Sequence, residues 1–188
     1  MAYYLEDELR SFGFRSLGKD VRLSRNASVY GADKISIGNH VRIDDFCVMS
    51  AGEGGIFLGD YIHIAVYSLI IGKGAVTLED FVNISSRVSI YSSNDDYSGV
   101  AMTNPMVPDC YTNVKVDDVK ICRHSVIGSG TVVLPGVLIG EGVAVGALSL
   151  VNHNCKPFGI YAGIPASRIK ERKTDFLELE RQFRQTRN

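Results

Sequence analysis

The sequence predicts an all-β fold, a parallel β-helix in which the chain winds as a triangular coil. The first observation is a six-residue repeat of aliphatic residues, cleanest at Ile121, Ile127, Val133, Ile139, Val145 and Val151. The second is that glycine often follows the aliphatic residue and that the fifth position is often small, as in IGSGTV, IGEGVA and VGALSL. A six-residue period is neither that of an α-helix nor that of a simple strand. Each hexad therefore predicts a short strand and a corner, with three hexads to a turn and both repeated positions facing inward.

The repeat extends over residues 17–157 and is interrupted once. Before the interruption the aliphatic positions are, with small slips, Leu17, Leu23, Val29, Ile35, Ile37, Ile43, Leu58, Ile64, Leu78, Ile84 and Ile90. At the corners we expect Gly, Asp or Asn, which tolerate the left-handed backbone of tight turns. Residues 91–114 break the rhythm and are rich in Ser, Asn, Asp, Gly and Pro, so they predict a long loop. A loop of this length inside a compact domain is usually functional.

Both ends of the chain show apolar residues at helical spacing. Over residues 2–14 they are Tyr4, Leu5, Leu9 and Phe12, which predicts a short amphipathic helix that caps the open end of the coil. Over residues 166–185 they are Ile169, Phe176, Leu177 and Phe183, which predicts a second amphipathic helix that covers the last coil. We expect residues 1–188 to form a single domain.

Composition argues against several classes of protein. The 188 residues carry 20 Lys and Arg against 21 Asp and Glu, so the chain offers no broad basic field for nucleic acid or for an anionic membrane. No apolar run approaches the roughly 18 residues of a membrane span. The acidic start, MAYYLEDELR, lacks the layout of a signal peptide, so we expect a cytoplasmic location. The spacing of the four cysteines indicates neither a zinc site nor a disulfide framework.

One face of the predicted coil has an unusual outer surface. When the hexads are registered in threes, the inner residues of this face are Ile43, Ile64, Ile84, Ile127 and Val145. Because side chains alternate along a strand, the residues on either side of these face outward. They form two columns, one of Arg42, His63, Asn83, Val126 and Ala144, and one of Asp44, Ala65, Ser85, Gly128 and Gly146. The columns are polar over the first coils and apolar or small over the last, which predicts a binding surface.

With this repeat, the interrupting loop and the segment YAGIPASRIK, the chain resembles the hexapeptide-repeat acyltransferases. That family implies a left-handed coil, acetyl-CoA as co-substrate, a homotrimer, and an active site between adjacent subunits that the long loop helps to shape. The resemblance also implies that the pantetheine arm of the coenzyme lies along the groove beside Gly128, Ser129, Gly146 and Ala147, where glycines allow a close approach.

The segment YAGIPASRIK matches the A-G-x-P-A signature of the family, except that Ile164 stands where Asn is common. By the same resemblance, Arg168 and Lys170 would bind the phosphates of the coenzyme as charge-assisted donors. An ordinary solvated basic helix start is the alternative interpretation of these two residues.

His63 is the histidine that faces the predicted binding surface. It is either a chemical group or a hydrogen-bonded structural residue between coils. His40 and His124 occupy the corner position of their hexads and His153 follows a slipping repeat, so we expect turn or surface roles for these three. Metal-dependent enzymes that share this repeat need several closely spaced histidines, and this spacing predicts no metal site.

The predicted loop lacks a histidine. Sugar O-acetyltransferases of the family carry one there as general base for an alcohol, whereas this chain reads VSIYSSNDDYSG. An alcohol, nearly as weak an acid as water with its pKa of about 15.7, needs such a base. A primary amine with a pKa of roughly 8 is already about one-tenth neutral at pH 7 and does not. The missing histidine favours an amine acceptor, with Asp95, Asp96 or His63 orienting the amine or collecting its proton. The resemblance implies that the thioester lies near His63 and Asn83, so the predicted catalytic residues are His63, Asn83 and Asp95.

The segments GDYIHIA, SSRVSIY and DDYSG resemble acetyltransferases of surface-polysaccharide biosynthesis. Within that group, the N-acetyltransferases of nucleotide-linked amino-deoxysugars, such as dTDP-4-amino-4,6-dideoxy-D-glucose for O-antigen or capsule, fit the loop best. The predicted substrate-binding residues are Arg42 for the pyrophosphate, Tyr97 or Tyr91 for stacking on the base, and Asp44, Ser85, Asn94 and Asp96. Two alternatives remain open: an O-acetyltransferase with His63 or a histidine of a partner subunit as base, and a noncatalytic trimeric β-helix scaffold.

Overall fold

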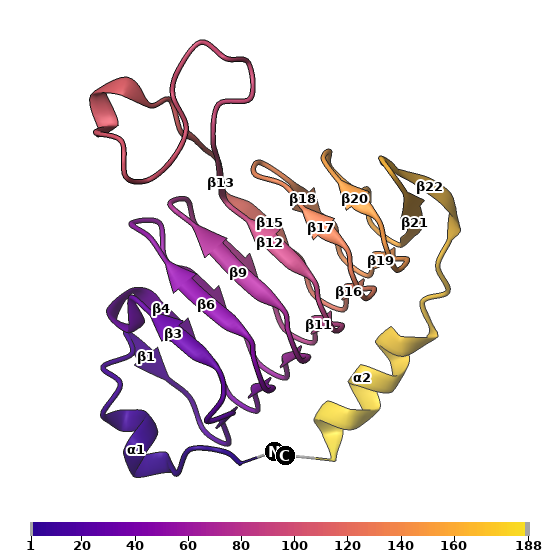
Figure 1. Cartoon of the computed structure of the whole chain (residues 1–188). Coiled ribbons are helices and arrows are strands. Elements are labelled where there is room, and N and C mark those ends of the chain that lie inside the picture. The colour runs from indigo at the N-terminus through magenta and orange to yellow at the C-terminus, as the bar shows by residue number, and fades with distance from the viewer. Residues whose placement is uncertain (1, 187–188) are drawn as a thin grey trace.

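The computed structural model describes residues 2–186 and confirms the predicted fold, a left-handed parallel β-helix. In Figure 1 the coil runs from the indigo N-terminal turns to the orange C-terminal turns, with the strands of successive turns side by side. The long loop leaves the coil at its upper edge, and the C-terminal helix runs along the lower edge. No helix within residues 2–186 is long and apolar enough to cross a membrane.

Each turn of the coil adds one strand to each of three faces, and the strands pair in parallel except at β22. The first face comprises β1 (Ser16–Leu17), β4 (Ile35–Ile37), β7 (Ile56–Leu58), β10 (Val76–Leu78), β15 (Val119–Ile121) and β18 (Leu138–Ile139). The second face comprises β2 (Arg22–Leu23), β5 (Arg42–Ile43), β8 (His63–Ile64), β11 (Asn83–Ile84), β16 (Val126–Ile127), β19 (Ala144–Val145), β21 (Gly159–Gly163) and β22 (Ala166–Glu171). The third face comprises β3 (Ser28–Tyr30), β6 (Val48–Ala51), β9 (Leu69–Gly72), β12 (Ser89–Tyr91), β17 (Val132–Val133) and β20 (Leu150–Val151).

The predicted register is confirmed on the second face. The inner residues pair from strand to strand and are buried in the core, in the order Ile43, Ile64, Ile84, Ile127 and Val145. The small fifth position of the hexad is also buried, and its polar groups are satisfied. Ser125, for example, donates its hydroxyl to the Gly140 carbonyl at 2.9 Å. Buried hydroxyls that find such a partner cost the core little stability.

The corners differ from the prediction of Gly, Asp or Asn. Large residues adopt the left-handed conformation at many of them, with φ between 56° and 61° at His40, Phe46, Tyr61, Tyr67, Phe81, Arg87, His124 and Leu148. Between the first and second faces these corner rings stack from turn to turn: centroids are 4.7 Å apart for His40 and Tyr61, and 5.0 Å for Tyr61 and Phe81. Ring contacts repeated along the corner offset the strain of this backbone conformation. His40 and His124 thus have the corner positions that the sequence predicts.

The N-terminal helix α1 (Glu6–Arg10) is shorter than the helix predicted over residues 2–14. The residues before it are extended because the chain bridges from Tyr3 to Ser24 at the edge of the second face. Leu9 is buried against the first coil. The segment therefore caps the open end of the coil, as expected, with less helix than expected.

The helix predicted over residues 166–185 is wrong in its first part. Residues 166–171 form β22, which pairs antiparallel with β21 at the end of the second face. This pairing satisfies backbone groups of β21 that a helix at the same place would leave without partners. The helix α2 (Asp175–Gln185) follows and packs along the corner of stacked rings, where Phe183 lies 5.3 Å from Tyr61 between ring centroids.

The predicted loop over residues 91–114 is better ordered at its base than a free loop. The strand β13 (Ser93–Asn94) pairs antiparallel with β14 (Lys115–Val116) and holds the two ends of the loop together. Within the loop, residues 109–111 form a 3₁₀ turn, and Met102 bridges to Thr112. The base of the loop is therefore fixed relative to β12.

The four cysteines form no disulfide. Cys47 and Cys155 are buried, and burial raises the pKa of each thiol to about 11. A thiol with so high a pKa is a poor nucleophile at neutral pH. These two residues are therefore parts of the core.

Candidate active site

The outer side of the second face carries the predicted polar column. Arg42 on β5 pairs in register with His63 on β8, and His63 pairs with Asn83 on β11. The next positions are Val126 and Ala144, so the polar part of the column ends at β11. Paired strands lie about 4.8 Å apart, so side chains of successive coils can contact one another.

Asp44 joins two members of this column. Its Oδ1 accepts a hydrogen bond from Arg42 Nε at 2.7 Å, and its Oδ2 lies 2.9 Å from His63 Nε2. Burial raises the pKa of this carboxyl, but the hydrogen bonds from His63 and Arg42 outweigh burial, so the pKa lies below its ordinary value. Asp44 is therefore ionised at neutral pH and fixes the two basic side chains.

His63 has partners on both sides of its ring. Its Nδ1 lies 3.2 Å from Asn83 Oδ1, opposite the contact of Nε2 with Asp44. A general base needs a ring nitrogen that can accept the proton of the substrate. Since both nitrogens are already engaged within the chain, this arrangement suits a positioned polar group better than a base.

The loop forms a pocket at its base. The pocket has a volume of about 430 Å³ and is lined by Tyr91, Ser93, Asn94, Asp95, Tyr97, Val114, Val132 and Leu134. A second pocket of about 480 Å³ shares Ser93, Asp95 and Val114 with the first. The structure therefore brings together four of the predicted site residues: Tyr91, Asn94, Asp95 and Tyr97. Ser93 was missed by the sequence analysis, and its place directly before the Asn-Asp-Asp run is the signal that could have found it.

The polar column and the loop pocket lie apart within one chain. In Figure 1, β11 is at the lower edge of the coil and β13 is at the upper edge, where the loop leaves. The predicted catalytic set of His63, Asn83 and Asp95 is therefore not assembled within a single subunit. His63 and Asn83 make one group, and Asp95 belongs to another.

No protein-family model matches the chain. Among curated proteins, it is 59% identical over 184 residues to dTDP-4-amino-4,6-dideoxy-D-glucose acyltransferase of Escherichia coli, a match that covers 98% of this chain and 96% of that relative. The chain belongs to the hexapeptide-repeat acyltransferases. It is therefore an acyltransferase, and the scaffold alternative is overturned. It is also 29% identical over 178 residues to a putative lipopolysaccharide biosynthesis O-acetyl transferase of E. coli K12, covering 85% of this chain and 88% of that one.

Solved structures agree with this family. AntD, an N-acyltransferase of Bacillus cereus crystallised with dTDP and 3-hydroxybutyryl-CoA, matches with a TM-score of 0.95 and 44% identity over 99% of this chain and 98% of its own. A variant of AntD in which cysteine replaces one serine was crystallised with dTDP-4-amino-4,6-dideoxyglucose and coenzyme A. It matches with a TM-score of 0.94 and 44% identity over 98% of this chain and 97% of its own.

Packing between successive coils of this hexapeptide-repeat acyltransferase requires glycine or a very small residue at Gly128 and Gly146. A Cβ added at Gly128 would lie 2.5 Å from the backbone nitrogen of Ala147 on the next coil, so no larger residue fits there. A Cβ at Gly146 would lie 3.0 Å from the Cβ of Ala162. Close approach of coils therefore accounts for both glycines without a coenzyme. Ser129 and Ala147, by contrast, are exposed beside this column.

The predicted phosphate-binding pair, Arg168 and Lys170, lies on β22 and is exposed. Arg168 Nη2 bonds Glu171 Oε2 at 2.7 Å. In the order of strands on the second face, β22 follows β19 and β21, so the pair lies at the C-terminal end of the glycine column. The placement is compatible with the expected role, which stays a prediction.

Asp96 belongs to the internal framework of the loop. Its Oδ1 accepts from the Ser98 hydroxyl at 2.7 Å and from the Ser98 N–H at 3.0 Å, and its Oδ2 accepts from the Ala101 N–H at 2.9 Å. These hydrogen bonds lower the pKa of the carboxyl to about 2. Asp96 thus shapes the loop that presents Asp95, and it does not line either loop pocket.

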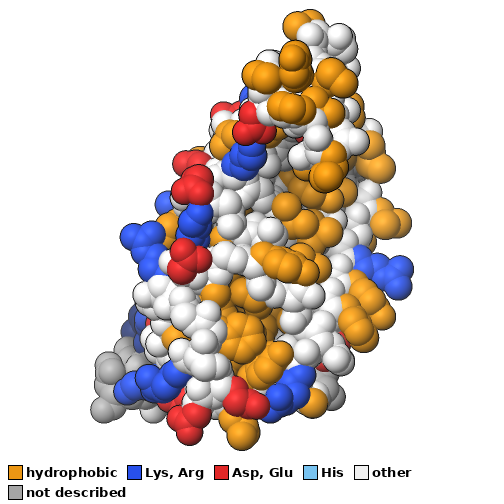
Figure 2. Space-filling model, turned by 60° about the vertical axis from the view of Figure 1, so that its left-hand side comes forward, with side chains coloured by type: hydrophobic (Ala, Val, Ile, Leu, Met, Phe, Trp, Pro, Cys, Tyr) orange, Lys and Arg blue, Asp and Glu red, His pale blue; other side chains and the backbone are white. Residues whose placement is uncertain are grey.

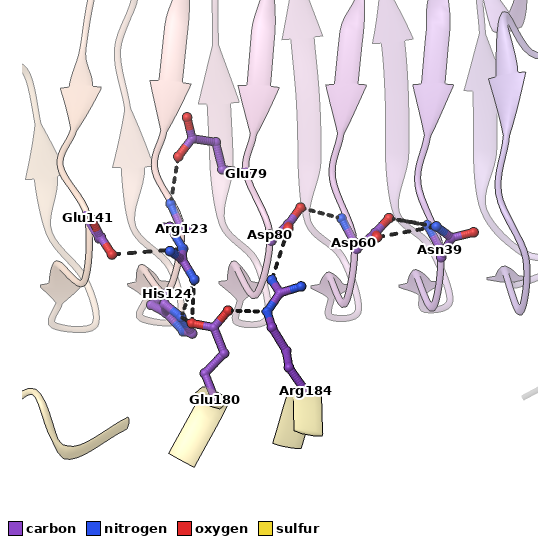
Figure 3. A network of polar contacts seen from close by, with 9 residues as sticks. All are labelled: Asn39, Asp60, Glu79, Asp80, Arg123, His124, Glu141, Glu180 and Arg184. Atoms are coloured by element: carbon purple, nitrogen blue, oxygen red, sulfur yellow. Dashed lines mark hydrogen bonds and ion pairs between the residues drawn. The ribbon is translucent and has the colours of Figure 1, made fainter. Parts of the chain in front are cut away.

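A polar network ties α2 to the coil (Figure 3). Glu180 accepts from His124 Nε2 at 2.6 Å and from Arg184 Nε at 2.7 Å, and it also pairs with Arg123. Arg184 reaches Asp80 on the coil at 3.6 Å. This network explains why His124 is largely buried at its corner, and it lies on a corner that carries none of the predicted site residues.

Within residues 2–186, no group of three His, Cys, Asp or Glu side chains is placed to hold a metal ion.

Proposed function

We propose that this chain transfers an acetyl group from acetyl-CoA to the amino group of a nucleotide-linked 4-amino-4,6-dideoxysugar, such as dTDP-4-amino-4,6-dideoxy-D-glucose. The observation that carries the proposal is the loop pocket, whose eight lining residues include Asp95 and no histidine. Such a pocket offers a carboxylate to an amine but no imidazole base to an alcohol. The names of the E. coli relative and of the AntD complexes support the same acceptor.

The reaction needs little base chemistry. The neutral amine nitrogen attacks the thioester carbonyl carbon, the C–N bond forms, and the C–S bond breaks. The amine loses one proton, and the departing sulfur of the coenzyme gains one, through solvent or through Asp95. An amine of pKa roughly 8 is about one-tenth neutral at pH 7, so the attacking species is already available. In this proposal Asp95 holds the amine, while His63 and Asn83 are polar contacts for the substrate.

Two AntD variants give independent support for Asp95 and Ser85. The crystallised variants of AntD alter one serine and one aspartate that lie ten positions apart in that chain. Ser85 and Asp95 have the same separation here, and so do Ser86 and Asp96. Asp96 is engaged within the loop, whereas Asp95 lines the loop pocket, which favours the first pair. This agreement in spacing supports roles for both residues at the site of acyl transfer.

We place the coenzyme along the exposed side of the glycine column. Ser129 and Ala147 would border the pantetheine arm, with Gly128 and Gly146 behind them. Arg168 and Lys170 at the end of the column would meet the phosphates as charge-assisted donors. The crystallised complexes of AntD with coenzyme A support a coenzyme site in this fold.

We propose a homotrimer in which the loop of one subunit meets the second face of the next. This arrangement would unite Asp95 with the polar column, which lie at opposite edges of one chain. Exposed apolar side chains support a covered surface: Phe46, Tyr67 and Leu148 project from the corner between the second and third faces. Figure 2 shows hydrophobic side chains gathered along the middle of one side of the molecule. Apolar patches of this kind are typical of protein interfaces.

A cytoplasmic location stays a prediction.

The test is to incubate the purified protein with acetyl-CoA and a panel of nucleotide sugars, and to follow release of free thiol. The panel pairs each 4-amino sugar with its 4-hydroxy analogue. We expect turnover with the amino sugars and little with the hydroxy sugars. Robust turnover with hydroxy sugars and none with their amino analogues would favour the O-acetyltransferase instead.

A further inference from the structure

Three basic residues lie in register at the N-terminal end of the second face. Arg22 on β2 pairs with Arg42 on β5, and Arg42 pairs with His63 on β8. Their side chains are 58%, 43% and 40% exposed, respectively. We call these three residues the basic column. The sequence analysis did not single out Arg22, although it stands twenty residues before Arg42, about one turn of the coil.

The acidic partners of the basic column lie to one side or beneath it. Asp20 lies 3.4 Å from Arg22 Nε and 3.0 Å from His40 Nδ1, so one carboxylate serves two basic groups. Asp44 binds both Arg42 and His63, and its own side chain is only 5% exposed. The side chain of Tyr3 also interacts with Arg42. The outward surface of the column is therefore made of cationic and donor groups.

Asp20 and Asp44 lie beside and beneath the column, so its outward side still presents basic groups in register. Like charges placed directly opposite each other on paired strands repel, and this destabilises the sheet. The remaining positions of the same column are Asn83, Val126 and Ala144, so the basic groups are confined to the first coils. A ligand with negative charge distributed over two neighbouring groups would relieve the repulsion and engage several donors at once. Guanidinium groups bind phosphate oxygens with matched geometry and strong charge-assisted hydrogen bonds.

We propose that Arg22 and Arg42 bind the diphosphate of the acceptor nucleotide, and that Asp44, which His63 also contacts, is the positioning residue that fixes Arg42 for this contact. The inference rests on the proposed function, because it takes the acceptor to be a nucleotide-linked sugar. It extends the expected role of Arg42 at the pyrophosphate by adding Arg22 and by making Asp44 the residue that holds Arg42 in place. It gives His63 a positioning part, through its contact with Asp44.

The coenzyme contains a diphosphate too, so the place proposed for the coenzyme must be compared with the basic column. The groove proposed for the coenzyme lies along Gly128 and Gly146 on β16 and β19 and ends at Arg168 on β22. The basic column lies on β2, β5 and β8, at the other end of the second face, with β11 between the two regions. This separation along the coil assigns the basic column to the nucleotide.

The test measures ligand binding by calorimetry with dTDP and, separately, with coenzyme A. The variant is Arg22→Gln, since a surface ion pair such as that of Arg22 with Asp20 contributes little to folding. The matched control is Arg181→Gln. Arg181 is a similarly exposed arginine, at 63%, and pairs with Glu178 within α2, outside the basic column.

Loss of one charge-assisted contact is expected to raise the Kd for dTDP by about 10- to 100-fold in Arg22→Gln. Arg181→Gln should bind dTDP as the wild type does, and the Kd for coenzyme A should be unchanged in both variants. Added salt should weaken dTDP binding more in the wild type than in Arg22→Gln. In steady-state assays, Arg22→Gln should raise the KM for the nucleotide sugar with kcat nearly unchanged.

An unchanged Kd for dTDP in Arg22→Gln would overturn the inference, and so would weakened binding of coenzyme A in place of dTDP. If the wild type acetylates the amino sugar in the same preparation, either result leaves the proposed function standing. A wild type that neither binds dTDP nor turns over would instead overturn the proposed function itself.

Discussion

His63 Nε2 lies 2.9 Å from Oδ2 of Asp44, a carboxylate that is almost wholly buried and also holds Arg42. A buried carboxylate in contact with an imidazole fixes the ring and its tautomer. In many enzymes that arrangement prepares a general base. Here the opposite nitrogen of the ring faces Asn83 at 3.2 Å, so the pair orients His63 without exposing a basic nitrogen.

The first prediction concerns His63. His63→Ala should raise the KM for the nucleotide sugar by about tenfold, the effect of losing about 1.4 kcal/mol of binding free energy. Turnover at saturating substrate should fall far less than the roughly 10²- to 10⁴-fold typical of a lost general base. Steady-state kinetics at several pH values measures both. Complete loss of kcat, with coenzyme binding intact and no recovery at high pH, would make His63 an essential base.

The second prediction concerns Asp95. Asp95→Asn keeps the size of the side chain but removes the charge that we propose holds the amine and collects its proton. We expect kcat to fall by no more than about 10²-fold, the lower limit for loss of a general base, with partial recovery as the pH rises toward 8. The recovery follows because a larger fraction of the amine is then neutral. If Asp95→Asn stayed inactive across this pH range, Asp95 would be an indispensable base.

The third prediction concerns the coenzyme groove. Gly146 contacts Ala162 so closely that a larger residue there would disturb packing, so the exposed neighbour Ala147 makes the cleaner test. Ala147→Leu should raise the KM for acetyl-CoA by about tenfold, equivalent to about 1.4 kcal/mol. The KM for the nucleotide sugar should change little. Ser36→Leu, on the first face, is the control and should change neither. Equal effects of Ala147→Leu on both constants would relocate the groove.

The fourth prediction concerns the attachment of α2. Burial raises the pKa of Glu180, but hydrogen bonds from Arg184 and His124 and the charge of Arg123 outweigh it, so the pKa lies below the ordinary 4.5. A carboxyl with a lowered pKa stabilises the fold above its ordinary pKa, and this stabilisation is lost as the pH falls through the folded pKa. Glu180→Gln should therefore destabilise the protein by about 2 kcal/mol at pH 7 and by progressively less below about pH 4.

Thermal unfolding across this pH range measures the effect of Glu180→Gln. The control is Glu178→Gln, which removes a half-exposed carboxylate that pairs within α2. It should change the free energy of unfolding far less than Glu180→Gln does. Equal destabilisation by the two variants would show that the contact of Glu180 with the coil stabilises the protein no more than the exposed pair of Glu178 does.

The six-residue period was sufficient to predict the coil, its inner residues and both outer columns. Each depends on local alternation, and the register followed once hexads were grouped in threes. The period also placed His40 and His124 at corners. It could not predict which residues tolerate the corner conformation, because the stacking of Tyr61 on Phe81 joins residues of different turns. The sequence pattern could not predict the partners of His63 for the same reason, since Asp44 lies nineteen residues away and on another turn.

Two features exceeded what a pattern in one chain can predict. The apolar and charged residues of β22 also fit helical spacing, so the sequence predicts a helix there. Pairing with β21 decides that the segment is a strand instead. The predicted catalytic set joined His63 with Asp95, although the coil holds them at opposite edges. In the proposed trimer a second subunit brings them together, and the periodicity of a single chain does not describe that contact.

An active site assembled from two subunits is the central claim, and mixed trimers test it most directly. Arg42→Glu should disable the polar column, and Asp95→Arg should disable the loop pocket, so each variant alone should be inactive. Co-expressed with separable tags, randomly mixed trimers should recover about a quarter of the wild-type activity on the amino sugar, because one site in four would combine an intact loop with an intact column from its neighbour. Purified mixed trimers that stay as inactive as the two parent variants would contradict the claim.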